Sequence, residues 1–395
     1  MLEFEGKYGK AVVMLDELEQ KTISQIYEFL NHPAFINDIR IMPDTHVGKG
    51  SVIGFTMPLN PDMVIPNIVG VDINCGMYFF FVGKGIFISM SRKEIDDRIR
   101  ERVPFGTSVH KKPVKIDTGF WPSVTADYRI FVMKFNKKYG TSYTPINFTE
   151  DWLKNKCDQI GMDYTRAVQS IGTLGGGNHF IELGQSENTG NYGFTIHSGS
   201  RQLGLKIANY WQKKAGKGQL AYLTGDDMFG YLGDTIFAQA YASLSRLHMA
   251  RHIVDACDLD WEMDVSGIIK TNHNFIDFDD FIIRKGAIRS YKGELMIIPF
   301  NMEDGILICE GKSNPDWNYS APHGAGRVDS RRWAKENLDL KKAKNNMDKK
   351  KIYYSKLPID ETKEAYKPAE LIEKAIAPTA TIVDRLKPII AMKDD

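Results

Sequence analysis

The sequence predicts an α+β protein, in which helices and strands mix without a regular alternation. Segments with helical hydrophobic spacing recur along the chain, and short β-branched or aromatic runs bounded by Gly and Pro lie between them. The chain has 395 residues with 43% hydrophobic and 26% charged content, which is typical of a globular protein with a deep core. Because the motifs described below are spread over the whole length, we expect one integrated domain at residues 1–395.

The helices are predicted from their spacing and their start signals. The segment 16–31 has helical spacing and begins with acidic residues, and Ser91 to Glu94 form a capping box that opens a helix ending near residue 102. Further helical patterns cover 150–170, 201–215 and 235–256, the last being the longest. The lysine-rich segment 335–351 is polar, so we expect an exposed helix or a mobile insertion there.

The strands are predicted where short apolar runs are bounded by Gly or Pro. These runs lie at 51–59, at 77–82, within 286–309 and at the C-terminal TIVDRLKPIIAMK.

The bulk properties exclude some classes of function. The net charge of +1 gives no general sign of nucleic-acid binding, although a local patch remains compatible with it. No apolar run reaches the roughly 18–20 residues of a membrane span, and the N-terminus lacks the pattern of a signal peptide. We therefore expect a cytoplasmic protein with no membrane partner. In that compartment the scattered cysteines are expected to be thiols or ligands: Cys75, Cys157, Cys257 and Cys309.

A set of metal-capable residues lies in glycine- or asparagine-rich surroundings, where we expect loops. One histidine of this kind is usually structural, but several together with a carboxylate and a thiol favour function. Imidazole, thiolate and carboxylate together suit zinc, manganese, iron or cobalt. A bridging thiolate with one carboxylate and three imidazoles would hold two cations with open positions, as catalysis requires. The residues are Asp72, Cys75, His179, His197, His273 and His323.

His323 differs from the other histidines because Gly-Ala-Gly-Arg and then Asp-Ser-Arg-Arg follow it. An imidazole beside a glycine-rich turn with Arg327 and Arg331 is typical of a nucleophile that carries a phosphoryl or nucleotidyl group. A solvated basic surface loop is the competing interpretation of this segment.

Other candidates are weaker. His248 and His252 are four apart on a helical pattern, but no glutamate follows His248, so a metal role is disfavoured. The lysines at 341–351 are more simply a solvated face than an RNA contact. His46, with Asp44 nearby, precedes a Gly-Lys-Gly turn and is a closer candidate for the site.

Seven motifs resemble, in this order, those of the RtcB family of RNA-splicing ligases. They are DTHVGKG, VGVDINCGM, GGGNHFIE, HSGSRQLG, NHNF, PHGAGR and KPIIAMK, and the match runs from about residue 38 to 393. The resemblance implies a single α+β domain with a central cleft that holds a dinuclear manganese site. It also implies GTP-dependent joining of an RNA 3′-phosphate or 2′,3′-cyclic phosphate end to a 5′-hydroxyl end, through histidine–GMP and RNA(3′)pp(5′)G intermediates.

The resemblance assigns roles by position. Cys75 would bridge two Mn²⁺ ions, Asp72 and His179 would complete one coordination sphere, and His197 and His273 the other. His323 would take GMP from GTP. The guanylate pocket would consist of Asn178, His179, Phe180, Ile181, Glu182, His273, Asn274, Pro299, Phe300, Asn301, Met302, His323, Gly324, Ala325, Gly326, Tyr366 and Lys393. The positions suited to RNA phosphate are Arg201, Arg327 and Arg331.

Three positions depart from the family pattern. Pro299 to Met302 read Pro-Phe-Asn-Met where Pro-Gly-Ser-Met is usual, Ile306 replaces a serine near the guanine, and Asp329 adds a negative charge after the GAGR motif. The first two bear on the strictness for GTP. A phosphoesterase that opens cyclic phosphates without sealing and an inactive RNA-end binder are the competing functions. The RNA itself and the need for an archease-type activator stay open.

Overall fold

Three sheets carry the strands, and they interleave segments that are distant in the sequence. The structure, a computed structural model, describes residues 1–36, 38–87 and 90–394. One sheet has the order β1 (Leu2–Glu5), β2 (Lys10–Val13), β3 (Ile39–His46), β4 (Ile53–Pro58), β10 (Ile282–Lys285) and β9 (Asn274–Asp277). The larger sheet has the order β12 (Leu295–Pro299), β13 (Ile306–Gly311), β16 (Ala380–Met392), β6 (Phe180–Ser186), β7 (Tyr192–Ser198), β5 (Gly76–Gly83) and β8 (Ser266–Asn272). In addition, β15 (Tyr353–Tyr354) pairs with β16, and β11 (Ala287–Arg289) pairs with β14 (Ser320–Pro322).

The two large sheets meet where β8 passes into β9. These strands belong to different sheets, and His273 alone separates them. The larger sheet is curled, so that its first and last strands, β12 and β8, approach each other. The backbone N–H of Ile297 on β12 donates to Thr271 Oγ1 on β8 (3.1 Å). Residues from both sheets, such as Ile53 of β4 and Phe180 of β6, line one cavity together with His273.

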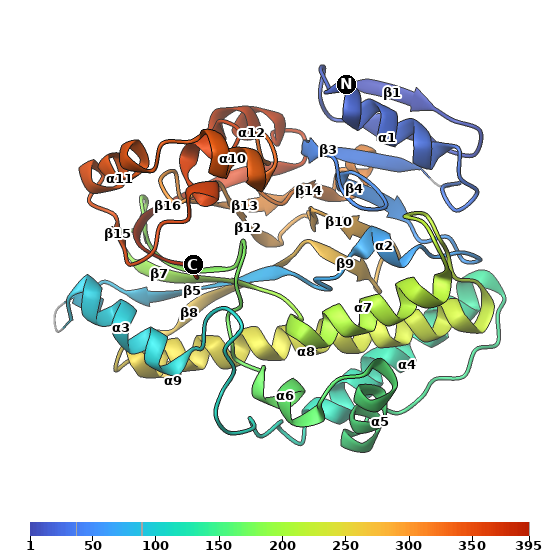
Figure 1. Ribbon diagram of the computed structural model, residues 1–395, viewed down its shortest axis with the longest axis horizontal. Coiled ribbons are helices and arrows are strands. Elements are labelled where there is room, and N and C mark those ends of the chain that lie inside the picture. Colours follow the sequence, from blue (N-terminus) through green and yellow to red (C-terminus); the bar gives the residue numbers. More distant parts are fainter. Residues whose placement is uncertain (37, 88–89, 395) are drawn as a thin grey trace.

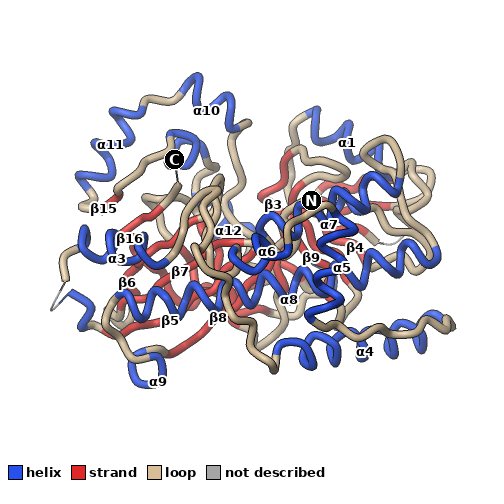
Figure 2. The backbone as a smooth tube through the Cα atoms, turned by 60° about the horizontal axis from the view of Figure 1, so that its bottom comes forward, coloured by secondary structure: helices blue, strands red, loops and turns tan. Residues whose placement is uncertain are grey.

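The longest helix, α8 (Gly225–Ala256), runs along the strands with α7 (Arg201–Ala215) beside it (Figure 1). The helices α4 (Phe120–Tyr139), α5 (Glu150–Ile160) and α6 (Tyr164–Gln169) lie on the side of α8 that faces away from the sheets. The remaining helices are α1 (Gln20–Leu30), α2 (Pro66–Val69), α3 (Arg92–Arg102), α9 (Trp261–Asp264), α10 (Arg331–Asn337), α11 (Leu340–Lys349) and α12 (Ala369–Ala375). In Figure 2 the helices surround a core of strands.

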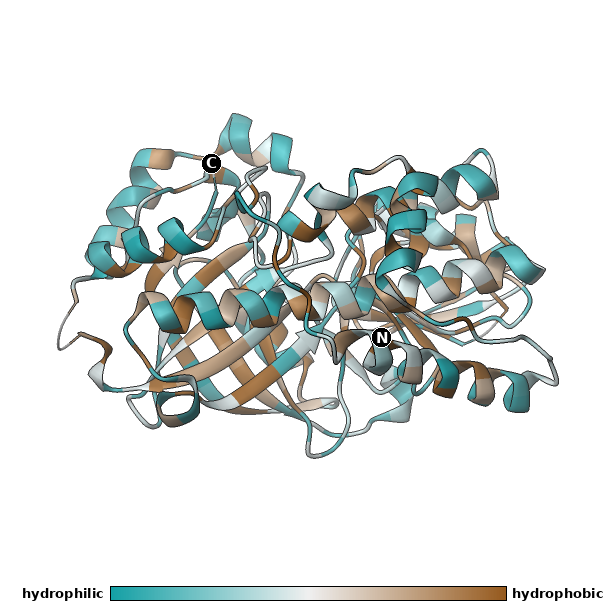
Figure 3. Cartoon of the chain, turned by 90° about the horizontal axis from the view of Figure 1, so that it is seen from below, coloured by the Kyte–Doolittle hydropathy of each residue, from teal (hydrophilic) through white to brown (hydrophobic). Residues whose placement is uncertain are grey.

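Apolar residues gather on the central strands and on the inner faces of the helices, while polar residues cover the outer faces (Figure 3). No helix in the described ranges is long and apolar enough to cross a membrane.

The expected α+β class is confirmed by this mixture of helices and sheets. The capping serine is also found, since Ser91 Oγ accepts the Glu94 backbone N–H at the start of α3. The predicted helix at 16–31 begins only at Gln20. The single helix predicted at 150–170 is wrong, because Gly161 adopts a left-handed conformation (φ 64°) that ends α5 before α6 begins.

Other helix boundaries differ from the sequence prediction. The helix predicted at 235–256 begins at Gly225, and α4 had no sequence prediction. The segment 335–351 forms the end of α10 and all of α11, whose lysines are exposed while Ala343 and Met347 are buried. The single-domain organisation over residues 1–395 stays a prediction.

Candidate active site

The structure brings the five predicted metal ligands together as two groups that share Cys75. One group contains Asp72, Cys75 and His179, and the other contains Cys75, His197 and His273. Within each group the candidate ligand atoms all lie within 4.8 Å of one another. Cys75 Sγ lies 3.1 Å from His197 Nε2 and 3.5 Å from His179 Nε2. A thiolate at this position is placed to bridge two cations.

The ligands come from different kinds of backbone. Asp72 and Cys75 lie in the turn between α2 and β5, and His179 directly precedes β6. His273 is the residue between β8 and β9. The expectation that every histidine of the set lies in a loop is wrong for His197, which is within β7 and pairs in register with Met77 of β5. Residues on both faces of β7 are buried, so its sequence lacks the alternation of polar and apolar residues that predicts a strand.

The close approach of two of these segments requires a glycine. A Cβ atom at Gly199 would lie 2.0 Å from Asp72 Oδ1, which is far inside van der Waals contact. The glycine in the HSGS segment therefore lets the strand that carries His197 pass against the carboxylate of Asp72.

The donor atoms fit a pair of cations. His179 Nδ1 lies 2.9 Å from the Leu174 carbonyl, so this nitrogen carries the proton and Nε2 is left as a lone pair 3.0 Å from Asp72 Oδ2. Burial, and then the neighbouring imidazoles, lower the pKa of His197 and of His273 well below the usual range, which keeps both rings neutral. Their Nε2 atoms face each other at 3.3 Å. Neutral imidazoles, a thiol and a carboxylate match zinc, manganese, iron or cobalt.

Arg246 of α8 holds the three ligand-bearing segments. Its side chain is fully buried, and Nη1 donates to the carbonyl oxygens of Asn74 (2.8 Å) and Ser198 (2.7 Å). Nη2 donates to Asn272 Oδ1 (2.9 Å). These partners are the chain neighbours of Cys75, His197 and His273, so one guanidinium fixes the positions of three ligands.

His323 lies beside this metal group, directly after β14, and its ring centroid is 4.9 Å from that of His273. Its Nδ1 is 2.6 Å from Oδ2 of Asp44, and its backbone N–H donates to the same oxygen (3.2 Å). Asp44 is fully buried on β3. The carboxylate accepts the Nδ1–H, which leaves the Nε2 lone pair free for attack.

The sequence pointed to Asp44 only as a neighbour of His46, not as the partner of His323. The two residues are 279 positions apart, and no local pattern reports a pairing of that range. Gly326 of the PHGAGR segment makes the approach feasible, because a Cβ atom there would lie 2.6 Å from the Asp44 carbonyl oxygen. His46 also lies at the site, with Nδ1 3.1 Å from that oxygen.

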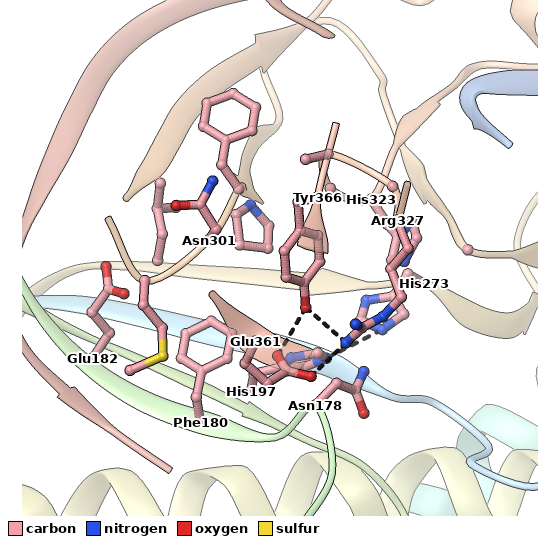
Figure 4. Close-up of a pocket in the computed structure, with 18 of the residues that line it drawn as sticks. Asn178, Phe180, Glu182, His197, His273, Asn301, His323, Arg327, Glu361 and Tyr366 are labelled. Carbon is pink, nitrogen blue, oxygen red and sulfur yellow. Dashed lines mark hydrogen bonds and ion pairs between the residues drawn. The ribbon is translucent and has the colours of Figure 1, made fainter. Parts of the chain in front are cut away.

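A cavity of ≈ 250 Å³ is lined by His323 and by His197 and His273 of the metal-capable groups (Figure 4). In Figure 4, Glu182 and Asn301 lie at one side, and His273 and His323 lie at the other. The predicted guanylate-pocket residues that line the cavity are Asn178, Phe180, Ile181, Glu182, His273, Asn274, Pro299, Phe300, Asn301, Met302, His323, Gly324, Ala325, Gly326, Tyr366 and Lys393. His179 belongs to the metal group and is not among the lining residues.

Sequence reasoning missed several lining residues, and Glu361 is the most consequential. Glu361 is buried. The sequence gave no sign of this, because the segment around it is rich in carboxylates and lysines and has no hydrophobic periodicity. Ile306, the expected serine position, lines the cavity as an apolar wall, whereas Asp329 is exposed and does not line it.

The three arginines that we predicted to bind RNA phosphate lie in two different places. Arg327 and Arg331 line the cavity, where both contact Glu361. Arg201 is outside the cavity lining, at the start of α7, where it donates to Thr173 Oγ1 (3.1 Å) and the Gly106 carbonyl (2.9 Å). His248 and His252 are in α8, and neither belongs to a metal-capable group within the described ranges.

Two metal-capable groups that share the sulfur of one cysteine, next to a histidine oriented by a buried carboxylate, have the composition of a metal-dependent enzyme site. The chain matches the family model described as tRNA-splicing ligase RtcB over residues 25–394, and it belongs to this family. It is 29% identical to RNA-splicing ligase RtcB1 of Escherichia coli strain ATCC 25922, with 95% of each chain covered. It is 28% identical to RNA-splicing ligase RtcB of strain K12, again with 95% of each covered. It is 23% identical to tRNA-splicing ligase RtcB of Aeropyrum pernix, with 88% of this chain and 86% of that protein covered.

Replacement of Arg246 is expected to weaken metal binding without a change in any ligand. The Arg246→Met variant leaves the Asn74 and Ser198 carbonyls without their donor, so we expect a loss of about 3 kcal/mol in unfolding free energy. We also expect metal affinity to fall roughly tenfold to a hundredfold, as for other outer-shell groups. Equilibrium dialysis with Mn²⁺ measures the affinity.

The matched control is Arg284→Met, because Arg284 is equally buried but binds Asp277, Asp280 and Ser320. It should destabilise the protein and leave metal affinity unchanged. Equal losses of metal in the two variants would contradict the role of Arg246.

Replacement of Cys75 is expected to reduce the bound metal in both groups, since both share its sulfur. Metal analysis of the purified Cys75→Ala variant should therefore show loss of most of the metal that the wild type retains. Cys309→Ala, which changes a buried thiol of the hydrophobic core, should retain it. A Cys75→Ala variant with unchanged metal content would rule out the shared thiolate.

Proposed function

We propose that this chain is a GTP- and Mn²⁺-dependent RNA ligase that joins an RNA 3′-phosphate or 2′,3′-cyclic phosphate end to a 5′-hydroxyl end, in tRNA splicing or RNA repair. One observation carries the proposal: His323, held through Nδ1 by buried Asp44, faces a cavity beside the two ligand groups. Membership of the RtcB family supports the RNA-joining reaction. Hydrolysis of a cyclic phosphate alone would not need a histidine nucleophile of this kind.

The metal role follows from the ligand groups. Asp72, Cys75 and His179 would hold one cation, and Cys75 with His197 and His273 the other. Bound there, the cations would supply charge neutralisation for phosphate groups beside His323. The choice of manganese rests on resemblance to the family, because this donor set also suits zinc and cobalt.

The proposed first step is attack by His323 Nε2 on the α-phosphorus of GTP. The bond from this phosphorus to the bridging oxygen breaks and pyrophosphate leaves. The ring then carries a positive charge, which the hydrogen bond from Nδ1 to Asp44 stabilises. An oxygen of the RNA 3′-phosphate next attacks the same phosphorus, the N–P bond breaks, and the RNA(3′)pp(5′)G end forms.

The last proposed step is attack by the RNA 5′-hydroxyl on the phosphorus attached to the 3′ end. The hydroxyl proton is lost, GMP leaves, and a 3′,5′-phosphodiester remains. This sequence explains why GTP is needed, since a bare phosphate monoester has no good leaving group. Arg201, Arg327 and Arg331 are proposed for RNA phosphates, and an archease-type activator and a cytoplasmic location stay predictions.

The base of GTP is proposed to bind at the end of the cavity that contains Glu182. This carboxyl is buried on β6, and its Oε1 has no hydrogen-bond partner within the described ranges. Burial raises the pKa of Glu182 to about 8, and the charge of Lys393 opposes that rise. In its ionised form, a carboxylate with an unpaired oxygen there is suited to the N–H donors of guanine, while Phe180, Met302 and Ile306 form apolar walls.

Incubation with α-labelled GTP and Mn²⁺ is expected to label the wild-type protein covalently, as detected on a denaturing gel. His323→Ala should abolish the label, because no other group is proposed to accept GMP. The control His252→Ala changes a histidine of α8 that does not line the cavity and should leave the label intact. Full labelling of the His323→Ala variant would exclude His323 as the nucleophile.

Nucleotide affinity is expected to depend on the ionisation of Glu182. Its folded pKa of about 8 lies above the ordinary value of 4.5, so ionisation destabilises the free protein as pH rises from 4.5 through 8. Guanine donors need the carboxylate, and GTP affinity in the wild type should therefore increase over the upper part of that range. Glu182→Gln should lower GTP affinity roughly tenfold or more. Calorimetric titrations between pH 6.5 and 9 measure both effects.

The same variant should unfold at a higher temperature than the wild type at pH 8, because the neutral amide avoids the cost of a buried charge. A pH-independent GTP affinity in the wild type would contradict this role of Glu182.

A further inference from the structure

The carboxylate of Glu361 receives four donors at the edge of the cavity. Its side chain is buried, and Oε2 accepts from Lys393 Nζ (2.8 Å) and from the Tyr366 hydroxyl (2.8 Å). Oε1 accepts from Arg331 Nη1 (2.8 Å) and from Arg327 Nη2. Figure 4 shows Tyr366 and Arg327 turned toward Glu361. Three cations around one carboxylate lower the pKa of Glu361 to about 2, although burial alone would raise it.

These four donors come from three separate parts of the chain. Arg327 ends the glycine-rich segment after His323, and Arg331 is the first residue of α10. Tyr366 follows a short 3₁₀ turn at Lys363–Ala365, and Lys393 follows β16 directly. One carboxylate thus connects the segment that carries the proposed nucleophile to the C-terminal strand of the larger sheet.

Lys393 has a second possible partner in the same cavity. Glu182 also lines it, and on β6 it lies opposite Ala391 of β16, two residues before Lys393. Burial raises the pKa of Glu182, and the charge of Lys393 acts against that rise. Yet within the part of the chain described, Glu182 Oε1 has no hydrogen-bond partner, while Lys393 is bound to Glu361.

We propose that Glu361 is a positioning residue that keeps the ammonium group of Lys393 away from Glu182, so that both remain available to a purine base. The inference rests on the proposed GTP site and extends it to nucleotide selection. Guanine has an acceptor oxygen next to N–H donors. A cation and a carboxylate together are complementary to this edge, because the cation donates to the oxygen and the carboxylate accepts from the N–H groups. An ion pair between Lys393 and Glu182 would satisfy both groups and remove that match.

The other donors make Glu361 suited to this task. Arg327 and Arg331 also contact the carboxylate, and Arg331 is shared with Asp360 (2.8 Å), so Glu361 has cationic partners besides Lys393. Only one of the three ammonium protons of Lys393 is needed for its contact with Glu361. Lys393 is therefore oriented by Glu361 and keeps further N–H groups with which to donate to a ligand.

The test is direct binding of GTP and ATP by calorimetry to the full chain carrying Glu361→Gln. The amide has nearly the same shape but no charge, so Lys393 should move to Glu182. We expect GTP affinity to fall roughly tenfold or more, ATP affinity to change little, and discrimination between the two to shrink. The rise of GTP affinity with pH should also shift to lower pH, because Lys393 would then favour the Glu182 carboxylate.

A double variant separates this role from a general structural one. In the Lys393→Ala background no ammonium is left to hold, so Glu361→Gln should have little further effect on GTP affinity. Asp234→Asn is the matched control, since it removes another buried carboxylate paired with a lysine, Lys156 (2.9 Å), away from the cavity lining. It should leave GTP affinity, discrimination and the pH profile unchanged.

Equal losses from Glu361→Gln in the wild-type and Lys393→Ala backgrounds, or an unshifted pH profile, would overturn the inference. If Glu361→Gln does not fold, Glu361→Asp is the alternative variant. Its carboxylate keeps the charge but lies farther from Lys393, because the side chain is shorter. We expect the same changes in the pH profile and in the discrimination between GTP and ATP, but smaller ones. An unchanged profile in that variant would also overturn it. A wild type that binds no GTP would instead refute the proposed function.

Discussion

The hydrogen bonds of one buried arginine are the constraint on which the rest of the site depends. Arg246 reaches from α8 to the neighbours of Cys75, His197 and His273, and all three contacts are with neutral oxygen atoms. Burial of this charge is costly unless every partner is in place. The ligand-bearing segments are therefore held in place by α8 before any cation binds. The same helix also contacts β9 of the other sheet, because the side chain of Gln239 pairs with the backbone of Ile276.

A second property of the site is that some of its buried polar atoms are left without partners. Asp44 Oδ1, Glu182 Oε1, and Nδ1 of His197 and His273 have none within the described ranges. Unpaired buried polar groups are expensive in a protein interior and are usually rare. Of these residues, Glu182 lines the cavity, and its Oε1 is available to a ligand there. The carboxylate of Glu361, by contrast, is occupied by four donors from other side chains.

The sequence predicted the chemistry of the site better than its geometry. Residue types and motif order identified the candidate ligands, His323 and most of the cavity lining, because those signals are local. The hydrogen bond between Asp44 and His323 and the contacts of Glu361 and Arg246 join residues far apart, and only the tertiary fold determines them. The strand around His197 was missed because it is buried on both faces, and the break at Gly161 because a single left-handed residue overrides helical spacing.

The central claim is that two cations share the sulfur of Cys75 beside His323. The most direct test is a crystal structure of the Mn²⁺-soaked protein with anomalous difference density collected near the manganese edge. The account predicts two anomalous peaks, one contacted by Asp72, Cys75 and His179 and the other by Cys75, His197 and His273. A single peak that does not contact Cys75, or peaks away from these residues, would contradict it.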